Sequence, residues 1–216
     1  MKNTTVLEMI NNGELEELKK LLMEEIYKDS LKSDSNAKTR YSAMKRFFKY
    51  VTSPNESCMK PCKDVNVYGT NYNSFCDGLC FALTNESIDT MECYDNSNGT
   101  YLNIERLVNF NNAQYVEEIN LNKTLAEAKS KGYKFSKSEY GTKDFHYAIK
   151  YKESYYNVLL IDKAYSIIND GESAKVYYFG RLAPMLIETN VGIAGICPFK
   201  ADNDVEEKKI IVCMED

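Results

Sequence analysis

The sequence lacks the motifs on which several large enzyme classes depend. It has no phosphate-binding loop of the Walker type, no glycine-rich dinucleotide motif and no Cys-x-x-Cys redox pair. It has one histidine, His146, so a catalytic triad or dyad with an imidazole base would have to use this residue. No pair of carboxylates stands out by its spacing. These absences favour a non-enzymatic protein that needs no cofactor.

Long apolar segments are absent as well. No run approaches the roughly 18 apolar residues that a membrane span needs. The N-terminal residues lack the apolar centre of a signal peptide. We therefore expect a cytoplasmic protein with no membrane contact, whose seven cysteines stay reduced.

The composition is that of a folded domain. The 216 residues are 44% hydrophobic and 27% charged, which is enough apolar material for a core. The net charge of -5 argues against indiscriminate binding of nucleic acid, although a local basic face remains compatible with it.

The N-terminal segment reads as an acidic helical unit. Leu15, Leu18, Leu22 and Ile26 recur with helical spacing, and residues 1–29 contain seven acidic and four basic side chains. A polar break follows, so we assign residues 1–33 to an acidic helical extension. Two interpretations stay open: a helical pair packed on the main domain, or an arm for docking or dimerisation.

A second predicted helix, over residues 36–52, has one apolar and one basic face. The segment contains no acidic residue. At 3.6 residues per turn its apolar face is formed by Tyr41, Met44, Phe47, Phe48 and Val51. The opposite face carries Lys38, Lys45, Arg46 and Lys49. Such a face is either simply solvated or contacts phosphates, because aligned cations match the charge of a nucleic-acid backbone.

The rest of the chain predicts short strands and two further helices. Strands are expected in residues 64–69, 75–84, 144–151, 155–161, 174–179, 184–189 and 192–199. One helix is expected over residues 123–135, closed by Gly132, and another over 163–170, capped by Asp162. Residues 84–122 show the least periodicity. Short connections favour antiparallel pairing, and the sequence predicts an α+β fold.

The cysteines raise the possibility of a metal site. Two Cys-x3-Cys pairs supply four thiolates: Cys58, Cys62, Cys76 and Cys80. Structural zinc sites more often use Cys-x2-Cys, and Cys76 and Cys80 on one face of a strand would lie about 13 Å apart. We therefore predict no metal site and expect both cysteines to fill the core. A tight turn at Asp77-Gly78 would bring the two thiols closer.

The same stretch raises the possibility of a nucleophile. "VYGTNYNSFCDGLCFAL" has some likeness to the NlpC/P60 cysteine peptidases, which implies Cys76 as nucleophile and His146 as base. Phe75 stands where an aspartate precedes the cysteine in that family, and the segment after Cys76 is a poor helix. A cysteine hydrolase is thus an alternative to the main prediction.

A broader resemblance covers residues 37–200. "PMLIETNVGIAGICPFK" follows the closing strands of a sliding-clamp unit, with matches at Pro184, Ile187, Glu188, Gly192, Ala194 and Pro198-Phe199-Lys200. Lys60-Pro61, "DVNVYG", "FCDGLCFAL" and "YLNIERLV" follow the opening half. The chain therefore resembles the bacterial sliding-clamp (DNA polymerase III beta subunit-like) superfamily, and within it short clamp-like proteins of phages and mobile elements.

The resemblance implies a DNA-clamp-like unit of antiparallel sheets, arranged as two similar halves with two helices on one side. It assigns residues 34–201 to this domain and 202–216 to a charged C-terminal tail. It implies a non-enzymatic protein that binds double-stranded DNA or a replication protein through Lys38, Lys45, Arg46 and Lys49, with oligomerisation left open. The helices that line a clamp's hole carry positive charge, but the second predicted helix offers only Lys163. A module that binds or inhibits a protein is a further alternative.

Overall fold

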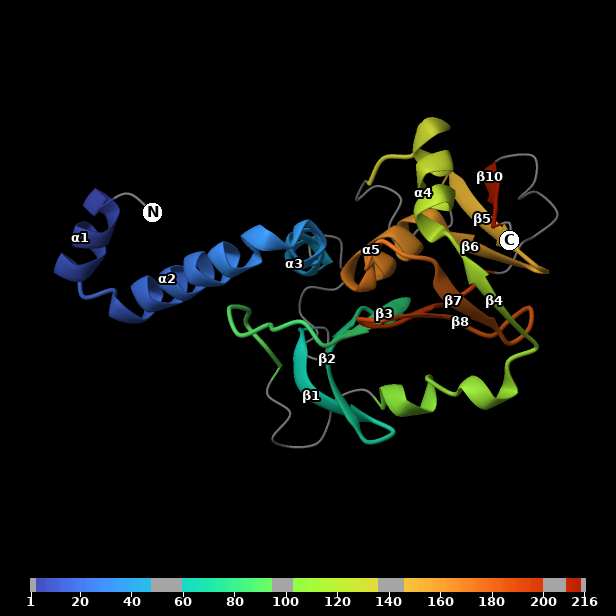
Figure 1. Ribbon diagram of the computed structural model, residues 1–216, viewed down its shortest axis with the longest axis horizontal. Helices are drawn as coiled ribbons and strands as arrows, with labels where there is room; N and C mark the ends of the chain where they lie inside the picture. Colours follow the sequence, from blue (N-terminus) through green and yellow to red (C-terminus); the bar gives the residue numbers. More distant parts are fainter. Residues whose placement is uncertain (1–2, 48–59, 95–102, 136–145, 200–208, 215–216) are drawn as a thin grey trace.

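The computed structural model describes residues 3–47, 60–94, 103–135, 146–199 and 209–214 (Figure 1). Its α-helices are α1 (Asn3–Asn11), α2 (Leu15–Ser30), α3 (Ser35–Phe47), α4 (Leu121–Ser130) and α5 (Val158–Ile168). The 3-10 turns are η1 (Leu31–Ser33), η4 (Ile104–Arg106) and η5 (Phe110–Asn112). The strands are β1 (Cys62–Val67), β2 (Thr70–Cys76), β3 (Cys80–Thr84), β4 (Tyr115–Ile119), β5 (Tyr147–Tyr151), β6 (Ser154–Asn157), β7 (Ala174–Tyr178), β8 (Met185–Thr189), β9 (Gly192–Ile196) and β10 (Ile210–Cys213).

The central feature is a seven-stranded antiparallel sheet in the order β1-β2-β3-β9-β8-β7-β4. The order shows two similar halves, because α3 precedes the meander β1-β2-β3 and α5 precedes the meander β7-β8-β9. The two meanders meet where β3 pairs with β9, with Ala82 opposite Ala194. The predicted α+β fold with mainly antiparallel strands is confirmed.

Each face of this sheet carries a cluster of buried side chains. On one face, residues of α3, α5 and α4 pack with the sheet in the main core, which includes Met44, Phe75, Ile161 and Ala194. The prediction of two helices on one side is confirmed, since α3 and α5 share this core. On the other face, the segment with η4 and η5 supplies Ile104 and Val108, which pack with Phe81, Leu83, Leu186 and Ile193.

A second, smaller sheet lies on the α5 side. It has the order β10-β5-β6, in which β5 and β6 are antiparallel while β10 and β5 are parallel. Ile149 of β5, Tyr156 of β6 and Val212 of β10 enter the main core. The chain therefore builds a second layer over the helix α5 (Figure 1).

Two elements differ from the sequence prediction for physical reasons. The sequence predicts one strand over residues 155–161, but the strand ends at Asn157 and α5 begins at Val158, where the Asn157 side chain accepts a hydrogen bond from the Leu159 amide (2.8 Å). Because ten of the eleven residues of α5 are buried, the helix shows no polar period at its start. Strand β4 falls in the least periodic segment because it is an exposed edge strand with two glutamates.

The stretch around Asp77 is a hairpin and not one bent strand. β2 ends at Cys76 and β3 starts at Cys80, and the Asp77 carboxylate accepts hydrogen bonds from the amides of Leu79 and Cys80 (2.9 Å each). Gly78 has φ of 85°, a backbone conformation that a glycine adopts without strain. The tight turn that the sequence allows here is therefore present.

Helices α1 and α2 form an arm that projects from the body (Figure 1). The end of α2 is anchored on α3, where the rings of Tyr27 and Tyr41 meet edge to face with centroids 5.0 Å apart. Leu15, Leu22 and Ile26 remain exposed on α2. None of the helices in the described part of the chain is both long and apolar enough to cross a bilayer.

Candidate nucleic-acid interface

Helix α3 presents the predicted basic face to solvent. Lys38, Lys45 and Arg46 are exposed, while Tyr41, Met44 and Phe47 on the other side are buried in the main core. Asp34 starts the helix by accepting hydrogen bonds from the amides of Asn36 (2.8 Å) and Ala37 (3.0 Å). The fourth predicted residue, Lys49, lies outside the described residues. The structure thus brings three of the four predicted cations together on one helix.

The three cations have different neighbours. Lys45 forms an ion pair with Glu24 of the arm, and Glu24 also binds Lys28 of its own helix at 2.7 Å. Hydrogen bonds from Lys28 and then Lys45 hold the pKa of Glu24 below its ordinary value. The Arg46 guanidinium lies over the Phe135 ring, 4.5 Å from its centroid. Within the described ranges, Lys38 has no ion-pair partner.

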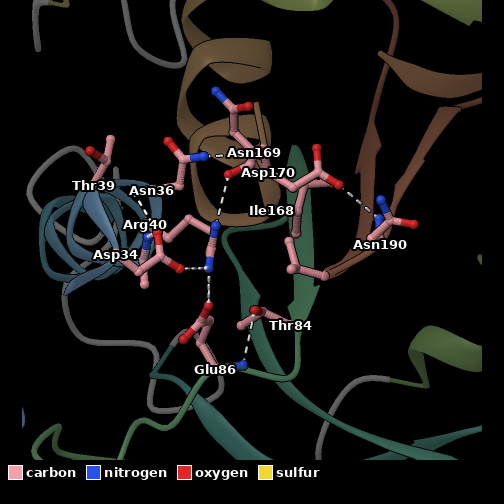
Figure 2. Close-up of polar contacts among 12 residues, drawn as sticks. Asp34, Asn36, Thr39, Arg40, Thr84, Glu86, Ile168, Asn169, Asp170 and Asn190 are labelled. Carbon is pink, nitrogen blue, oxygen red and sulfur yellow. Dashed lines mark hydrogen bonds and ion pairs between the residues drawn. The ribbon is translucent and has the colours of Figure 1, made fainter. Parts of the chain in front are cut away.

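Arg40 is a buried cation of α3 that the sequence analysis did not identify. Its Nε donates to the Glu86 carboxylate (2.8 Å) and its Nη1 donates to the Asn169 carbonyl (3.2 Å), as Figure 2 shows. Asn36 adds a hydrogen bond from its side chain to the Asp170 carbonyl (3.0 Å). This network fastens the start of α3 to the end of α5. The spacing held a clue, since Arg40 falls on the apolar face beside Tyr41.

Helix α5 presents no basic face. Its one cation, Lys163, is buried and forms an ion pair with Asp77 of the β2–β3 turn, which is also buried. The Lys163 ammonium lies 4.2 Å from the centroid of the Phe47 ring, so it contacts α3 as well. Lys163 therefore links the two halves internally and is not available to a ligand.

Cys76 and Cys80 are not placed to bind one metal ion. Cys76 packs on the η4 side of the sheet, whereas Cys80 packs in the main core on the other side. The prediction that they lie on the same face is wrong, because Cys76 pairs across the hairpin with Phe81, so that Cys80, the neighbour of Phe81, points to the other face. Burial raises the pKa of Cys62 to about 11 and that of Cys80 well above its ordinary value, which disfavours the thiolates that bind zinc. Cys58 lies outside the described residues, and those that are described contain no group of three metal-binding side chains.

The proposed nucleophile and base are not brought together. Cys76 is buried on the η4 side of the large sheet. His146 is exposed and immediately precedes β5, whose Ile149 and Tyr151 belong to the core on the opposite side. The large sheet therefore lies between the two residues.

No family model and no curated protein sequence matches the chain. Solved structures that resemble it include a protein described as a DNA polymerase III beta subunit from Eubacterium rectale, with a TM-score of 0.51 and 11% identity over 77% of this chain and 64% of that chain. Another is the DNA polymerase sliding clamp from Bacillus subtilis, with a TM-score of 0.49 and 10% identity over 77% and 63%. The match spans less than two thirds of either solved chain. At this identity the likeness to the first structure shows the fold alone, and this chain has a sliding-clamp-like fold.

Proposed function

We propose that this protein is a non-enzymatic, clamp-like protein that binds duplex DNA through the exposed basic face of α3. The observation that carries this proposal is the separation of charge on that helix. Lys38, Lys45 and Arg46 lie in solvent, and α3 contains no acidic residue that would repel a phosphate. Lys49, the fourth cation of the prediction, lies outside the described residues.

The packing of α3 suits it to hold a ligand. Its apolar side is buried, its start is fastened to α5 through Arg40, and its end contacts Lys163 through Phe47. The helix backbone therefore need not become ordered when DNA binds, which reduces the entropy cost of association.

The proposed contact is made along one side of the duplex. A ring lined by both clamp helices would need cations on α5, but α5 is covered and Lys163 is paired with Asp77. With a net charge of -5, the protein as a whole also repels DNA. Binding should therefore be weak at physiological salt and should strengthen as the salt concentration falls.

Charge reversal on α3 tests the proposal. We expect the double variant Lys38→Glu/Arg46→Glu to bind a labelled 30-base-pair duplex at least about tenfold more weakly than wild type at 50 mM salt, because two phosphate contacts are lost. Fluorescence anisotropy measures the affinity. The slope of log affinity against log salt should also fall in magnitude by about 2.

A matched control separates a local contact from the change in net charge. Arg106 and Lys175 are exposed on the η4 side of the large sheet, away from α3. Arg106→Glu/Lys175→Glu removes the same residue types and should leave the affinity within about twofold of wild type. If Lys38→Glu/Arg46→Glu binds as tightly as wild type, or if wild type does not bind the duplex at 50 mM salt, the proposal is wrong.

A second candidate is binding of a replication protein through the arm. It is favoured by Leu15, Leu22 and Ile26, which are exposed on an acidic helix that projects from the body. This candidate predicts no affinity of wild type for the duplex at any salt concentration. The anisotropy measurement therefore distinguishes the two.

A further inference from the structure

We propose that the end of α4 is a second phosphate-binding element, with Lys129 and Lys134 extending the α3 face along the same duplex. This inference rests on the proposed function of α3. Helix α4 covers α5, and under this inference α4 makes the contact with DNA that the buried helix α5 cannot make.

Helix α4 contacts α5 and the residue that follows it near both of its own ends. At its start, the side chains of Asn122 and Asn169 exchange hydrogen bonds of 2.7 and 3.3 Å, and Asn169 follows the end of α5. Beyond its other end, the Tyr133 hydroxyl donates to the buried Asp162 carboxylate (3.1 Å) in the first half of α5. Contacts at both ends therefore fix α4 over α5 (Figure 1).

The end of α4 is basic and exposed. Residues 128–135 contain three lysines and no acid. Lys131 is already occupied, since it pairs with Glu127 (2.6 Å) and donates to the Ile211 carbonyl (3.3 Å). Lys129 and Lys134 are exposed, and neither has an ion-pair partner in the part of the chain that the structure describes.

This basic segment joins the α3 face directly. Phe135 packs against the main core and supports the Arg46 guanidinium on its ring. Lys134 is the neighbour of Phe135, while Tyr133 before it is buried, so the exposed Lys134 side chain emerges next to the end of α3. Lys134 is thus linked through Phe135 to the Arg46 end of α3, and Lys129 lies five residues earlier in the last turn of α4.

The helix dipole explains the position of only one of the two exposed lysines. Cations in the last turn of a helix interact favourably with the helix dipole, which explains Lys129. Lys134 lies beyond the helix end, after Gly132 has turned the chain with φ of 100°, and gains little from the dipole. Exposed cations on two anchored elements can neutralise phosphates of one duplex.

The test uses the full chain and the same labelled 30-base-pair duplex at 50 mM salt. Lys129→Glu/Lys134→Glu should bind about tenfold more weakly than wild type and lower the magnitude of the salt slope by about 2. Arg106→Glu/Lys175→Glu is again the control, because it changes the net charge by the same amount. Circular dichroism and a thermal melt establish that the variants are folded, and Lys129→Gln/Lys134→Gln, with no new repulsion, should show the same loss of slope.

The outcomes separate this inference from the proposed function. If Lys38→Glu/Arg46→Glu weakens binding while both α4 variants bind like wild type, α3 is the interface and the α4 inference is overturned. If wild type does not bind, the proposed function and the inference both fail. Weaker binding and a smaller slope in both pairs of variants support one surface formed by α3 and α4.

Discussion

Helices α3 and α5 each precede a three-stranded meander of the large sheet, yet α3 keeps one face in solvent whereas ten of the eleven residues of α5 are buried. The difference follows from what surrounds them. The arm packs beside α3 and leaves its basic face exposed, while α4 and the small sheet β10-β5-β6 cover α5. A shared order of elements therefore does not give the two halves equivalent surfaces, and of these two helices only α3 keeps a basic face.

The two helices also differ in where their charged side chains lie. Cations on α3 are held in solvent, except for Arg40, which is paired in the interior. Lys163 on α5 is placed in the core with Asp77, where each ion depends on the other for its stability. The lysines of α3 therefore lie on the surface, whereas the lysine of α5 joins the two halves of the fold.

A replacement of Lys163 should lower the free energy of unfolding most, and it tests directly whether the buried lysine of α5 differs in role from the exposed lysines of α3. Lys163→Met leaves the buried Asp77 carboxylate without its cation, so we expect a loss of about 3–5 kcal/mol in the free energy of unfolding. Lys38→Met on α3 removes an exposed cation and should change it by less than about 0.5 kcal/mol. Urea denaturation measures both.

A double variant checks the cause of that loss. Asp77→Asn/Lys163→Met removes both charges, while the oxygen of the new side-chain amide can still accept from the two turn amides. This variant should therefore be more stable than Lys163→Met alone. If Lys163→Met unfolds at the same urea concentration as wild type, the pair does not stabilise the joint between the halves.

The joint between the two meanders should be the next most sensitive place. A Cβ atom built on Gly192 would lie 2.0 Å from the Leu83 carbonyl oxygen of β3 and 2.7 Å from a methyl group of Ile168 in α5. Gly192→Ala should therefore push β9 from β3 and cost about 1–3 kcal/mol. Gly69 in the β1–β2 turn has open space around it, although its φ of 85° adds some strain to any substitution there.

Thermal melts of Gly192→Ala and Gly69→Ala compare the joint with a turn at the edge of one half. We expect a clearly larger fall in melting temperature for Gly192→Ala. An equal fall for the two variants would mean that steric contact at the β3–β9 joint does not limit stability.

Much of the fold is predictable because its strands carry local signals. The three strands of the second meander have apolar patterns between clear turns, and the structure places β7, β8 and β9 where the sequence predicts them. The first residues of α5 carry no such signal, because a helix buried on every side has no polar face. The sequence allows a hairpin at Asp77 but does not predict it, because the turn depends on hydrogen bonds that a strand pattern does not reveal.

The candidate interface is predictable only in part. The helical period places Lys38, Lys45 and Arg46 on one face because it records which side of α3 is apolar. It does not show that Glu24 of α2 meets Lys45, or that Phe135 supports Arg46, because these contacts join segments far apart in the chain. The burial of Lys163 is invisible for the same reason, since its partner Asp77 is 86 residues away.

The smallest expected effect concerns the arm, which contacts α3 through Glu24 and Tyr27. Glu24 binds Lys45, so Glu24→Gln should free a cation of the basic face and raise the affinity for the 30-base-pair duplex by up to about fivefold, in keeping with the modest strength of an exposed ion pair. Glu17→Gln removes the same charge from an exposed position of α2 farther from Lys45 and should change the affinity less.

Because the pKa of Glu24 is lowered, its ion pair is fully formed above the ordinary carboxyl range and is lost only as the pH falls through the lowered value. The effect of Glu24→Gln should therefore be present at neutral pH, and equal affinities of Glu24→Gln and wild type in anisotropy at pH 7 would show that the arm does not restrict the α3 face.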